Sequence, residues 1–377
     1  MKVVLLHDWL TGFRGGERVL DAFCELFPDA PLYTLVHVPG SSSERIENRK
    51  ITASFLNKIP GIEKNYRKFL PLFPKAAESL RIVENADLVL SSSHCVIKGV
   101  QKPAGSKHIS YIHSPMRYLF DQYDVYFGPS APLTHRLGMK VFRNYLTKWD
   151  LNSNRNVDAM IANSRFVSER IKRIYGLPSE VINPFVDLAD FRELQKNPPA
   201  KSDFYLVVSA FAPNKRIDLA VQAFNRLGKK LKVIGSGQME EELRAMAGPT
   251  IEFLGNVSRE VVVRNLFEAR ALVFPGVEDF GITPIEALAA STPLVAFAAG
   301  GVLETMDADT AEFFNEATAE SLEEAVRRFE QKSFDPQILR VKAERYSRES
   351  FLKKMTGFID KFMSQPQNEV HSHHQLN

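Results

Sequence analysis

The sequence EDFGITPIE at residues 278–286 is the most informative stretch of this chain. It follows the apolar run ALVF at 271–274 and leads into the helix-like run IEALAA at 285–290. A strand that turns through a glycine into a helix presents backbone N–H groups and the positive end of a helix dipole, which suit an anion. The two glutamates of the stretch can accept hydrogen bonds from sugar hydroxyls. The stretch therefore predicts a site for a nucleotide sugar.

The same stretch also has a purely structural interpretation. TPIE at 283–286 has the pattern of a capping box, with Thr283 as N-cap, Pro284 at the first helical position and Glu286 at the third. In that interpretation Glu286 only caps its helix. Glu278 precedes the turn and has no comparable structural role.

Composition limits the function classes that remain. The 377 residues favour two or three domains, and 44% hydrophobic with 25% charged residues is ordinary for a globular protein. A net charge of +3 and the lack of a recognised module give no signal for a nucleic-acid partner. Cys24 and Cys95 alone can form neither a zinc site nor a disulfide framework, which fits a reducing cytosol.

The ends of the chain and its apolar runs indicate location. Residues 1–10 are too short for a signal peptide and are interrupted by Asp8, and no apolar run approaches the roughly 18 residues of a membrane span. We expect a cytoplasmic protein, soluble or peripheral on a membrane. The polar tail at 365–377 is expected to be disordered, and we favour a solvated tail over metal binding by its histidines, His371, His373 and His374.

Periodicity predicts two alternating series of strands and helices. The first has strands at 3–6, 32–36, 87–90, 108–112 and 159–162, and helices at 17–27 and 165–175. The second has strands at 205–209, 231–234, 251–254, 271–274 and 294–297, and helices at 218–227, 240–247, 259–268, 321–330 and 350–363. A polar stretch with three prolines at 183–203 is expected to be the domain boundary. The alternation predicts two doubly wound α/β domains that bind ligands at the carboxyl ends of parallel strands.

Several segments together resemble a known family. They are HDWLTG at 7–12 with RGGE at 14–17, YIHSPMRY at 111–118, NKRIDLA at 214–220, FPGVEDFG at 274–281 and AGG at 299–301. Through them the chain resembles the family-4 retaining glycosyltransferases, especially bacterial mannosyltransferases of lipopolysaccharide O-antigen and exopolysaccharide, over nearly all of residues 1–360.

That resemblance implies the GT-B architecture, in which two Rossmann-like domains face each other across a cleft that holds the active site. It implies an N-terminal acceptor-binding domain at 1–185 and a nucleotide-sugar-binding domain at 186–346. A C-terminal helix at 347–366 would cross back to the first domain, and the disordered tail would occupy 367–377.

The resemblance also implies site residues. His113, near the reacting sugar, Glu278, on the donor sugar's hydroxyls, and Lys215, on the leaving diphosphate, are the catalytic candidates. Glu286 would hold the ribose. The other donor-binding candidates are Gly15, Gly16, Arg216, Ser236, Gly237, Asn256, Val257, Phe280, Gly281 and Ile282. Simpler interpretations are a solvated lysine at 215, a loop or N-cap histidine at 113, and a plain turn at Gly15 and Gly16.

One position departs from the family pattern. The family has an arginine five residues before the lysine, where this chain has Ala210. A diphosphate clamp would thus lose one arm. Arg216 could compensate, point into solvent or pair with Asp218.

The implied reaction is transfer of a hexose, with mannose from GDP-mannose favoured, onto a saccharide carried by a polyprenyl diphosphate, with retention at the anomeric carbon. No metal and no cofactor beyond the donor are expected, because no carboxylate cluster is evident. The alternatives are a nucleotide-sugar 2-epimerase of the same architecture and a non-catalytic nucleotide-sugar-binding subunit. Isomerised donor would indicate the first, and binding without transfer would indicate the second.

Residues 50–81 mix basic with aromatic and aliphatic residues. This pattern predicts peripheral contact with an anionic membrane, close to a lipid-linked acceptor. A surface helical hairpin with a packed apolar face would produce the same pattern.

Overall fold

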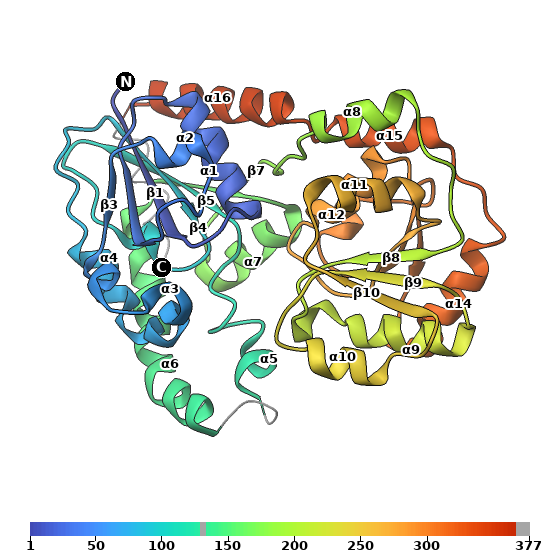
Figure 1. Ribbon diagram of the computed structural model, residues 1–377. Helices are drawn as coiled ribbons and strands as arrows, with labels where there is room; N and C mark the ends of the chain where they lie inside the picture. The colour runs from blue at the N-terminus through green and yellow to red at the C-terminus, as the bar shows by residue number, and fades with distance from the viewer. Residues whose placement is uncertain (129–132, 367–377) are drawn as a thin grey trace. The chain divides into compact units, whose positions relative to one another are not determined.

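The computed structural model describes residues 1–128 and 133–366. The expected tail at 367–377 and its three histidines lie outside the described residues. The chain divides into two compact units, one formed by residues 1–183 with the segment from 352 onward, and one formed by residues 184–351 (Figure 1).

The first unit is built on a seven-stranded sheet in the order β3-β2-β1-β4-β5-β6-β7, in which all neighbours are parallel. Every residue of β1, β4 and β5 is buried, as expected for a parallel sheet that is covered on both faces. The strands are β1 (Val3–Leu10), β2 (Leu32–His37), β3 (Ile51–Ala53), β4 (Leu88–Ser93), β5 (Lys107–Ile112), β6 (Ala159–Ala162) and β7 (Glu180–Val181).

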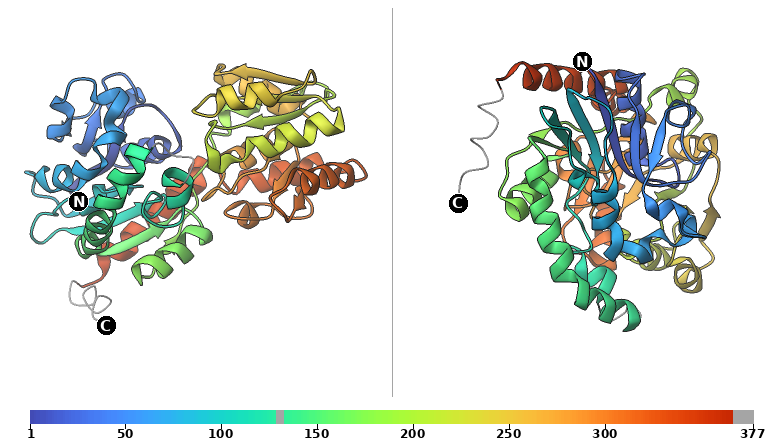
Figure 2. Two further views of the ribbon diagram at one scale, coloured as in Figure 1. Left: turned by 90° about the horizontal axis from the view of Figure 1, so that it is seen from below. Right: turned by 90° about the vertical axis from the view of Figure 1, so that its left-hand side faces the viewer.

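Helices connect these strands and cover the sheet. One face is closed by a core cluster in which Val4 and Leu6 of β1 join Tyr66 and Phe73. The longest connecting helix, α6, lies where no element was predicted, and Figure 2 shows it as one continuous rod. The helices are α1 (Gly15–Leu26), α2 (Glu44–Glu47), α3 (Ile62–Asn65), α4 (Phe73–Ser79), α5 (Tyr123–Phe127), α6 (Leu133–Ser153) and α7 (Arg165–Tyr175), with 3₁₀ turns η1 (Phe55–Lys58), η2 (Tyr66–Leu72), η3 (Ile97–Gly99) and η4 (Asn154–Asn156).

The first strand is longer than predicted. It continues beyond residue 6 to Leu10, although His7 and Asp8 are polar and fully buried. The Asp8 carboxylate accepts four backbone N–H groups, those of residues 94–97, at 2.7 to 2.9 Å. These bonds replace the water that Asp8 loses, so the strand can carry a buried charge.

The second unit contains a six-stranded parallel sheet in the order β10-β9-β8-β11-β12-β13. This order and that of the first sheet are doubly wound, which confirms the predicted α/β class. The strands are β8 (Tyr205–Val208), β9 (Leu231–Ile234), β10 (Ile251–Gly255), β11 (Leu272–Phe274), β12 (Leu294–Phe297) and β13 (Ala311–Phe314). The helices are α8 (Ala189–Lys196), α9 (Ile217–Leu227), α10 (Glu240–Met246), α11 (Arg259–Glu268), α12 (Ile282–Ala289), α13 (Val302–Thr305), α14 (Ala319–Phe329) and α15 (Pro336–Glu344), with the 3₁₀ turn η5 (Pro213–Lys215).

Alternate residues of these strands enter two different cores. Leu206, Leu272 and Leu294 pack with α8, α11, α12 and α15, whereas Val207 and Val273 pack with α9, α10 and α14. Figure 1 shows these two helical layers on opposite faces of the sheet. Because side chains alternate along a strand, each strand supplies both layers, and the loops at its ends remain available for a ligand.

The polar stretch at 183–203, which was expected to be the domain boundary, contains regular structure, and the second unit begins at Pro184. The stretch contains α8, and Phe191 of α8 is fully buried in the core of the second unit. A single aromatic anchor stabilises a helix whose other positions are mostly polar, so a composition-based interpretation misses it. The last helix, α16 (Arg348–Ser364), begins in the second unit and belongs to the first from residue 352 on. There Lys107 Nζ donates to the carbonyl oxygens of Phe362 and Gln365, at 3.0 and 2.6 Å.

Candidate functional site

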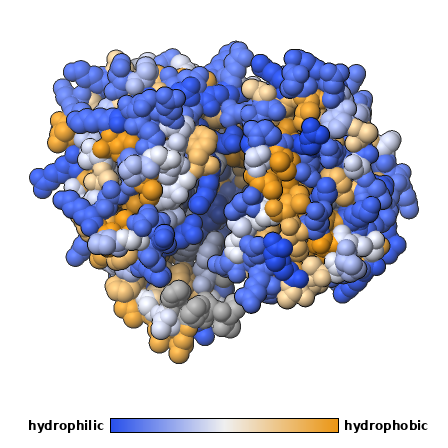
Figure 3. All heavy atoms as spheres, in the orientation of Figure 1, coloured by the Kyte–Doolittle hydropathy of each residue, from blue (hydrophilic) through white to orange (hydrophobic). Residues whose placement is uncertain are grey.

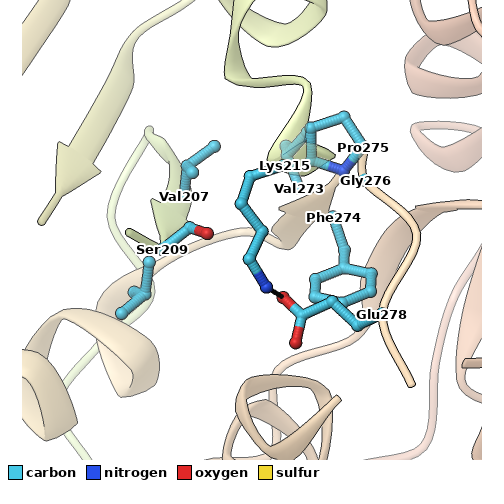
Figure 4. A pocket seen from close by; sticks show the side chains of 9 residues that line it. Val207, Ser209, Lys215, Val273, Phe274, Pro275, Gly276 and Glu278 are labelled. Atoms are coloured by element: carbon cyan, nitrogen blue, oxygen red, sulfur yellow. Dashed lines mark ion pairs between the residues drawn. The ribbon is translucent and has the colours of Figure 1, made fainter. Parts of the chain in front are cut away.

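The carboxyl edge of the second sheet brings Lys215 and Glu278 together. Lys215 closes the turn η5 after β8, and Glu278 follows β11, the neighbour of β8. Lys215 Nζ lies 2.6 Å from Glu278 Oε1 (Figure 4), and both side chains keep partial exposure, 18% and 25%. Together they close a small pocket lined by Val207, Val208, Ser209, Lys215, Val273, Phe274, Pro275, Gly276 and Glu278.

Two glycine positions allow the loops of this pocket to approach each other. A Cβ on Gly276 would lie 2.7 Å from the Cα of Lys215, and one on Gly301 would lie 2.4 Å from the carbonyl oxygen of Asp279. Gly301 also donates its N–H to the carbonyl of Glu278 at 2.8 Å. The AGG segment therefore holds the chain next to Glu278 in place, and Gly276 lets the Lys215 turn pack against the β11 loop.

The helix after Glu278 begins earlier than the capping-box interpretation requires. α12 starts at Ile282, its N-cap is Gly281 with φ of 90°, and no side chain caps it. Thr283 therefore lies inside the first turn and Glu286 at the fifth helical position, so the predicted capping box is wrong. Gly281 is needed because the left-handed conformation is costly for other residues. The first turn has N–H groups without intrahelical acceptors, as an anion site requires.

Glu286 pairs with an arginine that the sequence interpretation missed. Glu286 is 7% exposed, and its Oε1 lies 2.8 Å from Nη1 of Arg259 at the start of α11. Arg259 Nε also donates to Asp190 Oδ2 at 2.8 Å. Burial would lower the pKa of Arg259, but the two carboxylates outweigh it and raise the pKa. The sequence around Arg259 gives no local signal for this pair, because its partners Asp190 and Glu286 lie 69 and 27 positions away.

The loops after β9 and β10 carry further candidates at the same edge of the sheet. Ser236 Oγ bonds Asn256 Oδ1 at 3.1 Å, and the Ser236 carbonyl accepts the Phe211 N–H at 2.9 Å. Gly237 packs so closely on the Phe211 backbone that a Cβ would lie 2.6 Å from its carbonyl oxygen. Val257 packs against the hydrophobic core instead. The structure therefore brings Ser236, Gly237 and Asn256 together.

Three more candidates have defined surroundings. The Arg216 guanidinium makes three hydrogen bonds to the Asp218 carboxylate, at 3.0 to 3.3 Å, and so is not free to replace an arginine at position 210. Phe280 is buried and packs on Tyr346, with ring centroids 5.6 Å apart. Ile282 is the first residue of α12. Phe280 and Ile282 can therefore offer a ligand their backbone.

The first unit holds a separate polar cluster around His113, which follows β5. Ser92 Oγ lies 2.8 Å from His113 Nε2 and 3.1 Å from His7 Nδ1. His7 Nε2 in turn lies 3.9 Å from Glu17 Oε1. Gly15 and Gly16 open α1 beside this cluster, and a Cβ on Gly16 would lie 3.5 Å from the His7 ring.

Electrostatics in this cluster favour one arrangement of protons. The Glu17 carboxylate faces Nε2 of His7 and favours the tautomer protonated there. Nδ1 of His7 then accepts the Ser92 hydroxyl, which itself accepts Nε2–H of His113. Burial, with His94, His7 and Arg117 nearby, holds the pKa of His113 well below its usual value. His113 is thus neutral at pH 7, and in this arrangement its Nδ1 carries no proton.

The described part of the chain contains neither a candidate metal centre nor a candidate membrane-spanning helix. Within residues 1–128 and 133–366, no group of three or more His, Cys, Asp or Glu side chains could hold a metal ion. In the same part of the chain, no helix is both long and apolar enough to cross a membrane. Cys24 and Cys95 are both buried free thiols.

Comparison with family models matches both units. The model "Glycosyltransferase Family 4" matches residues 13–190, and "Glycosyl transferases group 1" matches residues 190–350. The chain belongs to glycosyltransferase family 4. Family membership confirms the resemblance that the sequence motifs carried.

Curated relatives of this family-4 chain are distant. The human alpha-1,3/1,6-mannosyltransferase ALG2 is 22% identical over 249 residues, which is 55% of this chain and 59% of the relative. The O-antigen chain mannosyltransferase RfbU of Salmonella typhimurium is 29% identical over 170 residues, 41% of this chain and 46% of the relative. The chain thus spans less than two thirds of the length of either relative.

Solved structures resemble the whole family-4 chain. Sucrose-phosphate synthase from Thermosynechococcus elongatus has a TM-score of 0.70 at 18% identity and covers 97% of this chain and 100% of its own. HepE from Anabaena, solved in complex with UDP and glucose, has a TM-score of 0.66 at 14% identity and covers 96% and 99%. These matches confirm the GT-B fold.

Proposed function

We propose that this protein is a retaining glycosyltransferase that moves mannose from GDP-mannose onto a polyprenyl-diphosphate-linked saccharide in the synthesis of a bacterial surface polysaccharide. The observation that carries the proposal is the Lys215–Glu278 pair, at 2.6 Å, next to the uncapped start of α12. The pair combines a cation for a diphosphate with a carboxylate for sugar hydroxyls at one sheet edge.

In this proposal the second unit binds the donor. Lys215 and the backbone N–H groups of residues 280–282 bind the diphosphate, whose charge grows as the glycosidic bond breaks. Glu278 accepts hydrogen bonds from the sugar, and Glu286 accepts them from the ribose. Ser236, Gly237 and Asn256 border the diphosphate and the base.

The reaction needs no protein nucleophile. The bond between the anomeric carbon and the diphosphate oxygen breaks, and the acceptor hydroxyl oxygen attacks from the same face. Its proton passes to the leaving phosphate oxygen, which becomes basic as the bond breaks. Because this path needs no protein nucleophile, Glu278 is not assigned that role. The neutral His113 accepts a hydrogen bond from a sugar hydroxyl.

The choice of mannose follows the names of the two curated relatives, both mannosyltransferases. The structural neighbour HepE was solved with UDP-glucose, so UDP-glucose is the competing donor to test. The first unit would bind the acceptor. Exposed cations in residues 50–81 would hold the enzyme on an anionic cytoplasmic membrane surface, where a lipid-linked acceptor lies.

Calorimetric titration with GDP, UDP and ADP tests the donor site. We expect one nucleotide, GDP, to bind, and Lys215→Ala to weaken its binding by at least about tenfold, the loss of one charge-assisted contact. Lys196→Ala is the matched control, because Lys196 is an exposed lysine of the same unit that pairs only with Glu193 at the surface.

A transfer assay with GDP-mannose and a lipid-linked acceptor then tests the reaction. Transfer with an unchanged anomeric configuration supports the proposal. Isomerised donor without acceptor would indicate a 2-epimerase instead. Nucleotide binding without turnover on any acceptor would indicate a non-catalytic binding subunit, for which Ala210 is the supporting observation.

A further inference from the structure

Helix α6 carries an apolar stripe that points away from the core. Leu133, Leu137, Val141 and Tyr145 follow each other at intervals of four, which places them along one side of the helix. Their exposed fractions are 64%, 57%, 73% and 41%, and Phe142 beside them is 41% exposed. Figure 3 shows hydrophobic side chains gathered at the lower end of the first unit, where α6 lies in Figure 1.

This stripe is not the face that holds α6 to the protein. The packed face contains Met139 and Leu146, which are 6% and 0% exposed. Trp149 Nε1 donates to Glu78 Oε1 of α4 at 2.6 Å, and Arg143 donates to the Leu119 carbonyl at 3.0 Å. The helix is thus apolar on two sides. Among the described residues, none buries the side chains of the outer side as core side chains are buried.

The surface around the stripe is positively charged. Arg136, Lys140 and Lys148 lie on α6 at least partly exposed, and its one acid, Asp150, is buried against Lys98 with Nζ and Oδ1 2.7 Å apart. In the neighbouring segment, exposed cations outnumber the exposed acids Glu63 and Glu78; these cations are Lys58, Lys64, Arg67, Lys68 and Lys75. The Trp149–Glu78 bond joins this segment to α6.

In the segment that was predicted to contact a membrane, the apolar and the charged side chains have different surroundings. In residues 50–81 the apolar side chains are mostly packed inside, since Leu56, Ile62, Tyr66, Leu70 and Phe73 are at most 7% exposed. The packed apolar face of the alternative interpretation is therefore present, although the segment forms short helices and 3₁₀ turns and not a helical hairpin. The cations remain at the surface. Phe55 and Leu72 of the segment are 40% and 39% exposed, so the segment can attract a membrane but offers less exposed apolar surface than α6.

We infer that α6 lies along the interface of an anionic lipid membrane, with Leu133, Leu137, Val141 and Tyr145 at the boundary between headgroups and acyl chains. Helices with lysine and arginine around a leucine-rich and aromatic side bind membranes in this way. The cations of α6 and of residues 58–75 would contact anionic headgroups. This inference extends the membrane contact of the proposed function and does not depend on sugar transfer.

The charges also argue against a second copy of the chain as the occupant. A two-fold contact through the α6 stripe would bring the same surface of each copy together. The cations Lys140 and Lys148 of one copy would then lie near the cations of the other, with no exposed carboxylate of α6 to neutralise them. An anionic lipid surface supplies the opposite charge that this helix lacks.

Vesicle co-sedimentation tests the inference with the full chain. The protein is expected to bind vesicles of phosphatidylcholine with phosphatidylglycerol and to bind phosphatidylcholine alone much less. Leu137→Gln/Val141→Gln should reduce the affinity by about tenfold or more, because two exposed apolar side chains no longer enter the lipid. The matched control is Leu303→Gln/Val341→Gln, which changes a leucine and a valine that are 52% and 61% exposed on the second unit.

The outcomes separate the alternatives. Binding that is lost in the α6 variant and kept in the control supports the inference. Equal binding by both variants, or no binding by the unchanged protein, overturns it. A concentration-dependent dimer in ultracentrifugation that the α6 variant loses, without vesicle binding, would make a second copy the occupant. The Lys215→Ala variant should keep vesicle binding while it loses nucleotide binding. A failure of the proposed donor site can therefore be distinguished from a failure of the membrane inference.

Discussion

Nζ of Lys215 and Oε1 of Glu278 lie 2.6 Å apart, so two residues with separate expected roles hold each other at the donor pocket. A diphosphate that binds Lys215 must compete with the Glu278 carboxylate for it. A sugar hydroxyl must compete with Lys215 for Glu278. If the proposed donor site is right, the pair couples the two halves of donor recognition: a diphosphate on Lys215 frees Glu278 for a sugar hydroxyl, and a sugar hydroxyl on Glu278 frees Lys215.

This coupling predicts opposite effects of Glu278→Gln on binding and on transfer. The amide removes the competing charge, so Lys215 should bind GDP a few times more tightly. Transfer should fall by about 10²-fold, the scale for loss of one preorganised polar contact in a transition state. Calorimetry with GDP and a single-turnover transfer assay measure the two effects. Weaker GDP binding together with normal transfer would contradict both roles.

Glu286 should discriminate the ribose. Calorimetry with GDP and with 2′,3′-dideoxy-GDP is expected to show a clear preference for GDP in the unchanged protein and almost none in Glu286→Gln, because the carboxylate is the stronger acceptor of ribose hydroxyls. Asp190→Asn is the control, since Asp190 is the other carboxylate on Arg259. If Glu286→Gln keeps the full preference, Glu286 serves only to pair with Arg259.

Buried histidines should make the protein less stable in mild acid. Burial lowers the pKa of His108 to about 4, and it also lowers those of His94 and His113. The unfolded state binds these protons more readily than the folded state. The contribution of these histidines to the free energy of unfolding is therefore fully present above the unfolded pKa of about 6.5 and falls as the pH drops towards the folded pKa values. His108 alone should cost about 2 kcal/mol between pH 7.5 and pH 5.

Urea unfolding at the two pH values measures this loss. The matched variant is His108→Gln, whose amide can keep bonds to the Asn156 carbonyl and the Ser91 hydroxyl, which the His108 ring nitrogens contact at 2.8 Å. This variant should show a smaller pH dependence, although its stability at pH 7.5 will be lower. An undiminished pH dependence in the variant would assign the effect to other groups.

The sequence predicted the two parallel α/β sheets well, because continuous apolar strands and glycine turns have strong local signals. The details of the site depend on contacts between distant residues. Glu286 looked like a helix cap, but Gly281 starts α12 two residues earlier, and Arg259, 27 positions before Glu286, takes its carboxylate. Local pattern could not show this pair. The same holds for Asp8, whose backbone partners lie at 94–97.

The α6 stripe was missed for a different reason. A helix that is apolar on two sides has no clear amphipathic period, so periodicity did not mark residues 133–153 as an element. Residues 50–81 showed the stronger mixture of basic and apolar residues, but most of their apolar side chains are buried in the core. Only the exposed fractions of the side chains distinguish the α6 stripe from the apolar residues of 50–81.

Ala210 occupies the position at which the family has an arginine. Ala210 is exposed in the loop after β8, directly after Ser209, which lines the Lys215 pocket. Arg216 does not supply the missing charge, because its guanidinium is held by Asp218. Ala210→Arg should therefore raise GDP affinity by about fivefold to tenfold, a charge-assisted contact reduced by solvent screening. Ala200→Arg, at another exposed alanine of the unit, adds the same charge away from these loops and should have little effect. Equal gains in both variants would indicate a nonspecific effect of charge, and no gain in Ala210→Arg would mean that the diphosphate does not reach this loop.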